Sequence, residues 1–425
     1  MMKKALWGTG LAVGAVMTGS AFAADAPTPE AIVDNYIAIA RADYGDSLTT
    51  AEALDAAIKT FVATPTEENL GAAREAWKAA RVPYQQTEAF RFGNAVVDDW
   101  EGRVNAWPLD EGLIDYVDAG YGSESDANSL YTLNVIAHSS IEIGGKTIDA
   151  SKITPELISG TLQEAGEIES NVASGYHAIE FLLWGQDLNG TGPGAGNRPA
   201  SDYDTANCTN GNCDRRIEYL TSASELLVSD LKEMVGDWQD GGAAYEALKA
   251  KSPEEGLATI FTGMGSLSYG ELAGERMKLG LLLHDPEEEH DCFSDNTYNS
   301  HYYDIVGIRN VYFGTYTRVD GSKVEGPSLS ALLEAKSPEV ATELQRKLDA
   351  TLAAATAMKA RGETVEAYDQ MIGEGNTEGN AVVQTVIDGL VDQTRSIERG
   401  VSALGLSEIA FEGSDSLDSP DSVFQ

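Results

Sequence analysis

The chain has 425 residues and a formal net charge of −39, with 68 acidic residues against 29 lysines and arginines. So negative a surface repels phosphate backbones and anionic lipid, which argues against nucleic acid as a partner, and it attracts cations. The length exceeds what one typical hydrophobic core holds, so two domains are expected.

The first 23 residues have the pattern of a secretory signal peptide. Two lysines precede an apolar run over residues 5–18, and a small-x-small cleavage site follows at 21–23. No later stretch reaches the ~18 apolar residues that a membrane-spanning helix needs. We therefore expect an exported protein of the periplasm or cell envelope, with no transmembrane segment.

Helix starts recur along the chain in one form. Ser or Thr caps free backbone N–H groups, Pro takes the first helical position, and Glu opposes the positive end of the helix dipole. The five starts lie at Thr28, Thr64, Thr154, Ser252 and Ser337. Capping boxes are expected from Thr49 to Glu52, Thr64 to Glu67 and Ser252 to Glu255.

Apolar residues between these starts recur at helical spacing, as at Ile32, Tyr36 and Ile39. Strand-like alternation is confined to about 311–313. The sequence therefore predicts an all-α protein built from helix bundles. Two aperiodic stretches, 188–214 and 285–303, are expected to be long loops, and the first could also be a linker.

The three cysteines divide into a pair and a single residue. Cys208 and Cys213 flank a tight polar turn, so we predict a short disulfide in an oxidising compartment. Cys292 is left over, and a buried, inert thiol is expected there.

A weak internal repeat is also present. Arg91 precedes Asp110 by 19 residues, and Arg276 precedes Asp295 by the same number, at an offset of 185. This offset is close to half of the chain. It favours two related bundles, over 25–205 and 206–425.

The motif with the clearest chemistry is Gly-Tyr-His-Ala-Ile-Glu at 175–180. His177 and Glu180 are three residues apart, so on a helix they share a face and can bind one metal ion or share a proton. Apolar residues surround them, so a buried Glu180 needs a partner. From the spacing alone a satisfied core pair is the simpler interpretation, and a metal ion would need ligands from elsewhere.

Several carboxylates could complete such a site. Glu88 is one, with an ordinary surface ion pair as its alternative. Glu271 and Glu275 are four apart and share a helical face, where a cation or Arg276 could lie between them or where solvent could surround both. An acidic run, for which a solvated loop is the simpler interpretation, contains Glu287, Glu288, Glu289, His290, Asp291 and Asp295.

These stretches together resemble the imelysin family, also called insulin-cleaving metallopeptidase-like or iron-regulated protein A-like. Residues 175–180 match its Gly-x-His-x-x-Glu signature, and the resemblance covers nearly all of the chain after the signal peptide. Supporting segments lie at 83–91, 107–110, 192–199, 208–216, 274–277 and 292–297.

The resemblance implies two duplicated helical bundles, an envelope location in iron-responsive settings, and a metal site at His177 and Glu180 near the domain interface. Members are classed as metallopeptidases. If the repeat holds, the counterpart of His177 is Gly362, so the His–Glu pair exists once.

Three functions follow. The first is a periplasmic metal-binding protein for iron uptake, with envelope partners and with iron favoured over zinc. Its ligands would be His177 and Glu180, with Glu88 and either Glu271 or Glu275. The second is a zinc peptidase with Glu88 or Glu275 as general base. The third is a non-catalytic module for a peptide or haem-like ligand.

Overall fold

The computed structural model describes residues 26–407 and 409–424, so the signal peptide expected over 1–23 lies outside the described residues. The described chain is mainly helical, which confirms the all-α prediction. The α-helices are α1 (Pro29–Ala63), α2 (Glu67–Thr87), α3 (Ala95–Glu101), α4 (Pro155–Leu157), α5 (Gly175–Trp184), α6 (Cys213–Asp237), α7 (Ala243–Lys249), α8 (Pro253–Ser266), α9 (Leu279–Leu283), α10 (Thr297–Phe313), α11 (Leu329–Lys336), α12 (Pro338–Thr364), α13 (Tyr368–Ile372), α14 (Thr377–Ala403) and α15 (Asp415–Asp418).

Other helical turns and two hairpins complete the secondary structure. The π-helices are η4 (Ile158–Leu162) and η6 (Leu267–Lys278). The 3-10 turns are η1 (Glu88–Phe90), η2 (Glu111–Leu113), η3 (Ala119–Tyr121), η5 (Ala200–Tyr203), η7 (Pro286–Glu288), η8 (Cys292–Ser294) and η9 (Pro420–Phe424). The antiparallel hairpins pair β1 (Ser140–Ile143) with β2 (Lys146–Asp149) and β3 (Thr315–Thr317) with β4 (Lys323–Glu325).

The strand-like pattern at 311–313 is not a strand. These residues form the last turn of α10, and Gly314 ends the helix with φ +65°. A left-handed residue at this position satisfies the last helical carbonyls, and glycine adopts it without steric cost. Strand β3 begins immediately afterwards, at Thr315.

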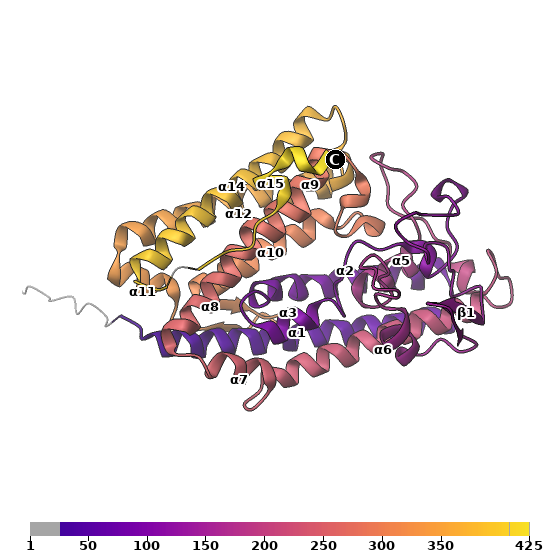
Figure 1. Cartoon of the computed structure of the whole chain (residues 1–425), viewed down its shortest axis with the longest axis horizontal. Coiled ribbons are helices and arrows are strands. Elements are labelled where there is room, and N and C mark those ends of the chain that lie inside the picture. Colours follow the sequence, from indigo (N-terminus) through magenta and orange to yellow (C-terminus); the bar gives the residue numbers. More distant parts are fainter. Residues whose placement is uncertain (1–25, 408, 425) are drawn as a thin grey trace, which may run out of the picture.

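The long helices form two layers, which are seen in Figure 1. In one layer α1 packs against α2 and α6, and in the other α12 packs against α14, which also contacts η6. Helix α10 contacts both α2 and α12 and so joins the layers. The crossing with α2 is close, because a Cβ at Gly307 would lie 2.4 Å from the Gln86 carbonyl oxygen.

Several predicted helix starts are confirmed. Thr28 accepts a hydrogen bond from the Ala31 N–H at the start of α1, and Thr154 caps α4 in the same way. Ser252 and Glu255 form the complete capping box of α8. Each cap satisfies backbone donors that the first helical turn leaves free.

Two predicted capping boxes are wrong. Thr66 caps α2, and Thr64 is the C-cap of α1. Thr49 lies inside α1, where its hydroxyl donates to the Gly45 carbonyl. Helix α1 runs through this point because Ala51, Leu54 and other buried residues continue its apolar face.

Helix α6 begins soon after the expected domain boundary, yet it packs against α1 and α5. The predicted disulfide between Cys208 and Cys213, the first residue of α6, is confirmed. The division at 205/206 and the duplication stay predictions.

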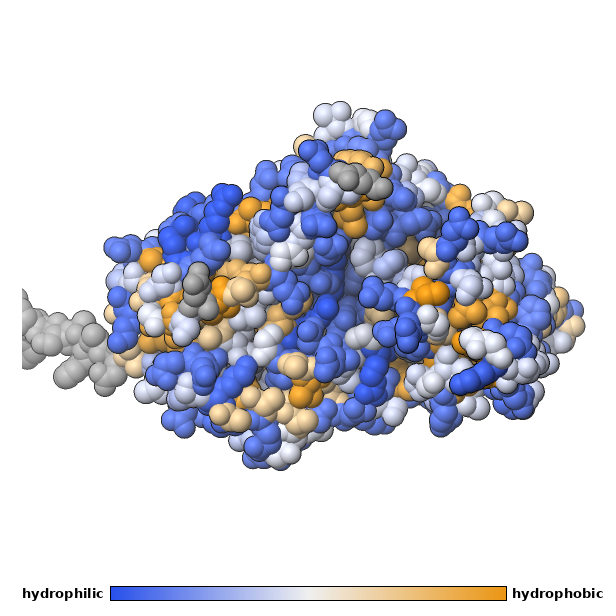
Figure 2. Space-filling view, viewed as in Figure 1, coloured by the Kyte–Doolittle hydropathy of each residue, from blue (hydrophilic) through white to orange (hydrophobic). Residues whose placement is uncertain are grey.

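No described helix is long and apolar enough to cross a membrane. Hydrophilic residues cover much of the face that is seen in Figure 2.

Candidate functional site

The Gly-x-His-x-x-Glu motif begins helix α5 at a close backbone contact. Gly175 has φ +77°, and a Cβ there would lie 2.3 Å from the Val104 carbonyl oxygen. That oxygen accepts a hydrogen bond from the Tyr176 N–H at 2.8 Å. Only glycine fits such an approach in this conformation. The glycine of the motif therefore fixes where α5 starts and which way its side chains face.

All ten residues of α5 are buried, because α2, α6 and η8 pack around it. His177 Nδ1 lies 3.1 Å from Glu180 Oε2, as the three-residue spacing predicted. The other oxygen, Oε1, accepts from the Ser294 N–H at 3.0 Å and from its hydroxyl at 2.6 Å. Glu180 thus connects α5 to the segment after η7. His177 Nε2 has no hydrogen-bond partner among the described residues.

Two residues of the acidic run lie beside His177. The ring of His290 is 4.8 Å from the His177 ring, centre to centre, and Asp291 Oδ1 is 4.0 Å from His177 Nδ1. Each of the three side chains offers one ligand atom within 4.8 Å of the other two. All three are buried. This is the one such His, Cys, Asp and Glu group in the described ranges.

The guanidinium of Arg81, on α2, pairs with Asp291. Arg81 Nη2 is 2.7 Å from Asp291 Oδ1 and 3.3 Å from His290 Nδ1, and Nη1 donates to Asn105 at 2.6 Å. Asp291 also accepts from Ser300 and, at 2.8 Å, from Asn296. Asp291 is therefore held as a charged carboxylate inside the protein.

Burial determines the protonation of the cluster. It lowers the pKa of His177 to about 3, with a further contribution from the positive charge of Arg81. Burial likewise lowers the pKa of His290. It raises the pKa of Glu180 well above its ordinary value, and the nearby charge of Asp291 acts in the same direction. The imidazoles are therefore neutral near pH 7, which is the state that coordinates metals.

The donor set fits a transition metal ion. Ligand atoms that bind one ion at about 2.1 Å lie at most about 4.2 Å apart, so the observed group needs only a small contraction. The unpartnered Nε2 of His177 is a ligand atom with no competing bond. A carboxylate on Nδ1, as Glu180 provides, is the usual partner that orients a metal-binding imidazole. The competing group is Arg81, which already neutralises Asp291.

A cavity of about 350 Å³ reaches the two imidazoles. Trp107 lines it, and its indole N–H donates to the Glu289 carbonyl at 2.6 Å. Its lining residues are Trp107, Pro108, Leu109, Asp110, Glu111, Gly120, Tyr121, Tyr131, His177, Glu287, His290, Cys292 and Phe293.

The structure does not bring the other predicted ligands into this group. Glu88 and Glu271 each lie 2.7 Å from Arg276 Nη2. Arg91 also contacts Glu271, at 3.3 Å. Because η6 is a π-helix, residues five apart come together, and Arg276 Nε hydrogen-bonds to Glu271. A cation, Arg276 and solvent were the possibilities for Glu271, and its partner in the structure is Arg276.

Glu275, the second residue of that predicted pair, is exposed. It lines a different cavity, together with residues 413–416 of the C-terminal segment. Neither candidate general base is therefore beside His177: Glu88 is engaged by Arg276, and Glu275 faces away.

Part of the cluster is not evident from the sequence. The acidic run favours a solvated loop, and this prediction is wrong for Glu289, His290 and Asp291, which are at most 1% exposed. Nothing in the sequence near Arg81 indicates its role. The apolar residues Cys292 and Phe293 directly after Asp291 were the available signal for burial.

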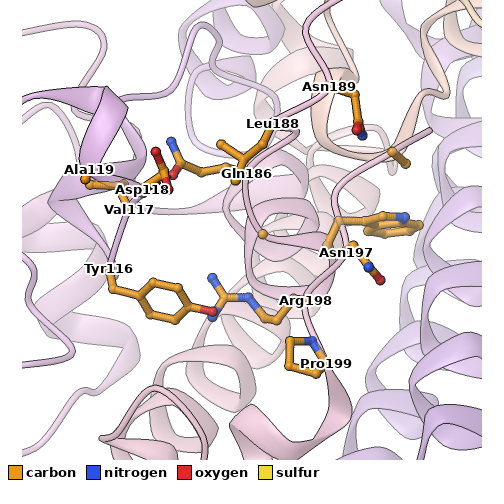
Figure 3. A pocket seen from close by; sticks show the side chains of 13 residues that line it. Tyr116, Val117, Asp118, Ala119, Gln186, Leu188, Asn189, Asn197, Arg198 and Pro199 are labelled. Carbon is orange, nitrogen blue, oxygen red and sulfur yellow. Dashed lines mark hydrogen bonds between the residues drawn. The ribbon is translucent and has the colours of Figure 1, made fainter. Parts of the chain in front are cut away.

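A separate cavity, of about 370 Å³, lies beside the Gly-Pro-rich segment before η5 (Figure 3). Arg198 and Tyr116 face each other there, with the guanidinium carbon 5.0 Å from the ring centre. Asp115 holds Arg198 at 2.7 Å. Neither His177 nor Glu180 lines this cavity, so it is not part of the candidate site.

Known proteins resemble the chain over most of its length. Iron-regulated protein A of Synechococcus elongatus is 24% identical over 386 residues, which cover 88% of this chain and 84% of the relative. A crystal structure described as an iron-regulated protein A precursor, from Parabacteroides distasonis, has a TM-score of 0.63 at 21% identity and covers 91% of this chain and 97% of its own.

An imelysin-like protein from Psychrobacter arcticum has a TM-score of 0.56 at 18% identity, covering 91% of this chain and 98% of its own. At these identities the two solved structures establish a shared fold. The family model described as Imelysin matches residues 40–397. The chain therefore belongs to the imelysin family.

Proposed function

We propose that this chain is an exported envelope protein that binds iron, as cargo for iron uptake, at His177, His290 and Asp291. Glu180 holds His177 in the ligand orientation. The observation that carries the proposal is the buried group of His177, His290 and Asp291, whose ligand atoms lie within 4.8 Å of one another. His177 Nε2 also has no hydrogen-bond partner among the described residues. A mixed nitrogen and carboxylate set suits iron or zinc.

The names of two relatives support iron over zinc. Both the Synechococcus protein and the Parabacteroides structure are called iron-regulated protein A. The strongly acidic composition adds a long-range attraction for cations. Delivery to envelope partners would follow release from the site, and the cavity that reaches His177 and His290 is the available exit.

Metal affinity tests the proposal. Titration calorimetry with Fe²⁺ under anaerobic conditions, and with Zn²⁺, should show one site in the full chain. The variants His177→Ala and His290→Ala should each weaken it by roughly 100-fold or more, because each removes one of three ligands. His138→Ala, at an exposed imidazole, is the matched control. Unchanged affinity in both site variants would show that these ligands are wrong.

The peptidase alternative rests on the same cavity. A cavity of about 350 Å³ next to two imidazoles has room for part of a peptide chain. A bound metal ion would supply an activated water there. Turnover of peptides that stops with a chelator and in His177→Ala, but continues in His138→Ala, is the result that this alternative requires.

A further inference from the structure

Two buried carboxylates near the candidate site have no hydrogen bonds. Glu289 is 1% exposed and Asp369 is 2% exposed. None of their four oxygens has a partner in the described chain. The Thr297 hydroxyl, which lowers the pKa of Glu289, and the Gln370 N–H, which lowers the pKa of Asp369, lie outside hydrogen-bonding geometry. Buried carboxylates are normally paired or bound to a metal, so these two need an explanation.

Both side chains line the same small cavity. Glu289 follows η7, and Asp369 lies in the first turn of α13, so separate parts of the chain meet here. The cavity has a volume of about 10 Å³, which is close to the minimum for one water molecule or ion. The other acidic residues that line it are Glu111, Asp187 and Glu287. Neither His177 nor His290 does so.

The nearby charges do not neutralise the two carboxylates. The ionic groups that act most strongly on Glu289 are three further carboxylates, Asp369, Asp295 and Asp187. Burial and the negative charges of Asp295 and Asp187 raise the pKa of Asp369 to about 7. The arginines of the region are used elsewhere, Arg81 by Asp291 and Arg276 by Glu88. The cavity therefore brings several carboxyl groups together, and no described lysine or arginine lines it.

We propose that Glu289 and Asp369 bind a hard divalent cation, such as Ca²⁺, in this cavity. The donors are all oxygens, which is the chemistry that Ca²⁺, Mg²⁺ and Mn²⁺ prefer over softer metals. Ca²⁺ tolerates irregular coordination and accepts bidentate carboxylates, so it suits a site built from separate segments. The proposal does not depend on iron binding, since the two sites share no ligand.

The other groups around the cavity have different roles. Glu111 accepts from the Gln186 side chain at 3.4 Å, and Asp187 accepts from the Asn189 N–H at 2.9 Å. Because Asp369 belongs to α13, and Glu111 and Asp187 precede α6, a bound cation would connect segments that are far apart in sequence.

A calcium-binding measurement tests this site. The full chain is first freed of metals with a chelator. Titration calorimetry should show Ca²⁺ uptake, and a 100-fold excess over Kd should raise Tm by roughly 2–5 °C. The double variant Glu289→Gln/Asp369→Asn should weaken Ca²⁺ binding at least 100-fold and abolish the Tm shift. Glu275→Gln neutralises an exposed carboxylate and should retain both. His177→Ala should retain them as well, which separates this site from the iron site.

Luminescence of Tb³⁺ provides a measurement on the unmodified chain. Tb³⁺ replaces Ca²⁺ at oxygen sites. Tyr368 would sensitise its emission, because it is next to Asp369 in the chain and close enough to Glu289 for that charge to raise its pKa. Emission that Ca²⁺ quenches by competition and that falls in Tyr368→Phe supports the site. Absence of Ca²⁺, Mg²⁺ and Mn²⁺ binding in the unmodified chain, or equal affinity in the double variant, overturns the proposal. In that case the two carboxyls are simply protonated.

Discussion

The guanidinium of Arg81 lies 2.7 Å from Asp291 Oδ1 and 3.3 Å from His290 Nδ1, so an internal cation already contacts two of the three proposed metal ligands. Arg81 and Asp291 are 1% and 0% exposed. Metal binding therefore has to compete with the guanidinium or move it. The affinity of the site depends on this one ion pair as well as on the ligands.

Removal of the guanidinium should lower stability and raise metal affinity. In Arg81→Met, Asp291 is left buried and unpaired, which costs about 3–5 kcal/mol in the free energy of unfolding. The competing cation is gone, so Zn²⁺ and Fe²⁺ should bind more tightly than in the unmodified protein. Urea denaturation and titration calorimetry measure the two effects.

The double variant Arg81→Met/Asp291→Asn is the control for the stability effect. It removes the unpaired charge and should recover part of the lost stability, while metal affinity falls because a ligand is lost. Loss of metal binding in Arg81→Met itself would contradict the competition.

Glu180 is expected to orient His177 rather than to bind the metal ion itself. Both carboxylate oxygens are occupied, one by His177 and the other by Ser294. The variant Glu180→Gln keeps the shape and should weaken metal binding by about 10–100-fold, as is typical when the partner of a ligating imidazole is changed. Complete loss of binding, equal to that of His177→Ala, would indicate a direct ligand. Titration calorimetry distinguishes the two.

His301, on α10, should make the protein sensitive to acid. Neither ring nitrogen has a hydrogen-bond partner in the described chain, and burial lowers the pKa to about 3 from an ordinary 6.5. Between these values the unfolded chain binds a proton that the folded chain does not. The stabilisation is therefore complete above pH 6.5 and is lost as the pH falls toward 3.

In His301→Phe this contribution is absent. Between pH 6 and pH 4 the free energy of unfolding of the unmodified protein should fall by about 1.4 kcal/mol per pH unit more than that of the variant. Denaturant titrations at several pH values measure the difference in unfolding free energy between the two proteins. The contributions of the carboxyl groups cancel in this difference, because both proteins contain them. Parallel curves would contradict a neutral, buried His301.

Gly175 should tolerate no side chain. Its left-handed conformation alone costs an alanine about 1–3 kcal/mol, and the clash with the Val104 carbonyl adds to this. Gly175→Ala should therefore lower Tm and, because α5 shifts, weaken metal binding. Gly71→Ala in α2 is the matched control: its Cβ would meet no atom within 4 Å, and it should stabilise by roughly 0.5–1 kcal/mol. Equal thermal stability in the two variants would refute the close contact.

Local features were predictable from the sequence. The capping boxes illustrate both the success and its limit, since Ser252 and Glu255 form one, whereas Thr49 lies within a helix. The same short pattern serves as a cap only where the apolar face of the preceding helix ends. The Cys208–Cys213 disulfide was predictable because it closes a turn of few residues.

Long-range partners were not predictable in this way. Glu271 and Glu275 share a face on an α-helix, but the π-helix η6 turns one toward Arg276 and the other toward solvent. The acidic run looks solvated because its residues are charged. Burial of Asp291 depends on Arg81, about 210 residues earlier in the chain, as its counterion.

By itself, the sequence determined the helical class, most helix starts, the disulfide and the His177–Glu180 pair, because each depends on residues within a few positions of one another. Only the tertiary structure decided which groups surround that pair. It brought His290, Asp291 and Arg81 together, and it assigned Glu88 to Arg276 instead. The physical reason is that a buried charge takes its partner from whichever segment packs beside it, and that packing is a property of the whole fold.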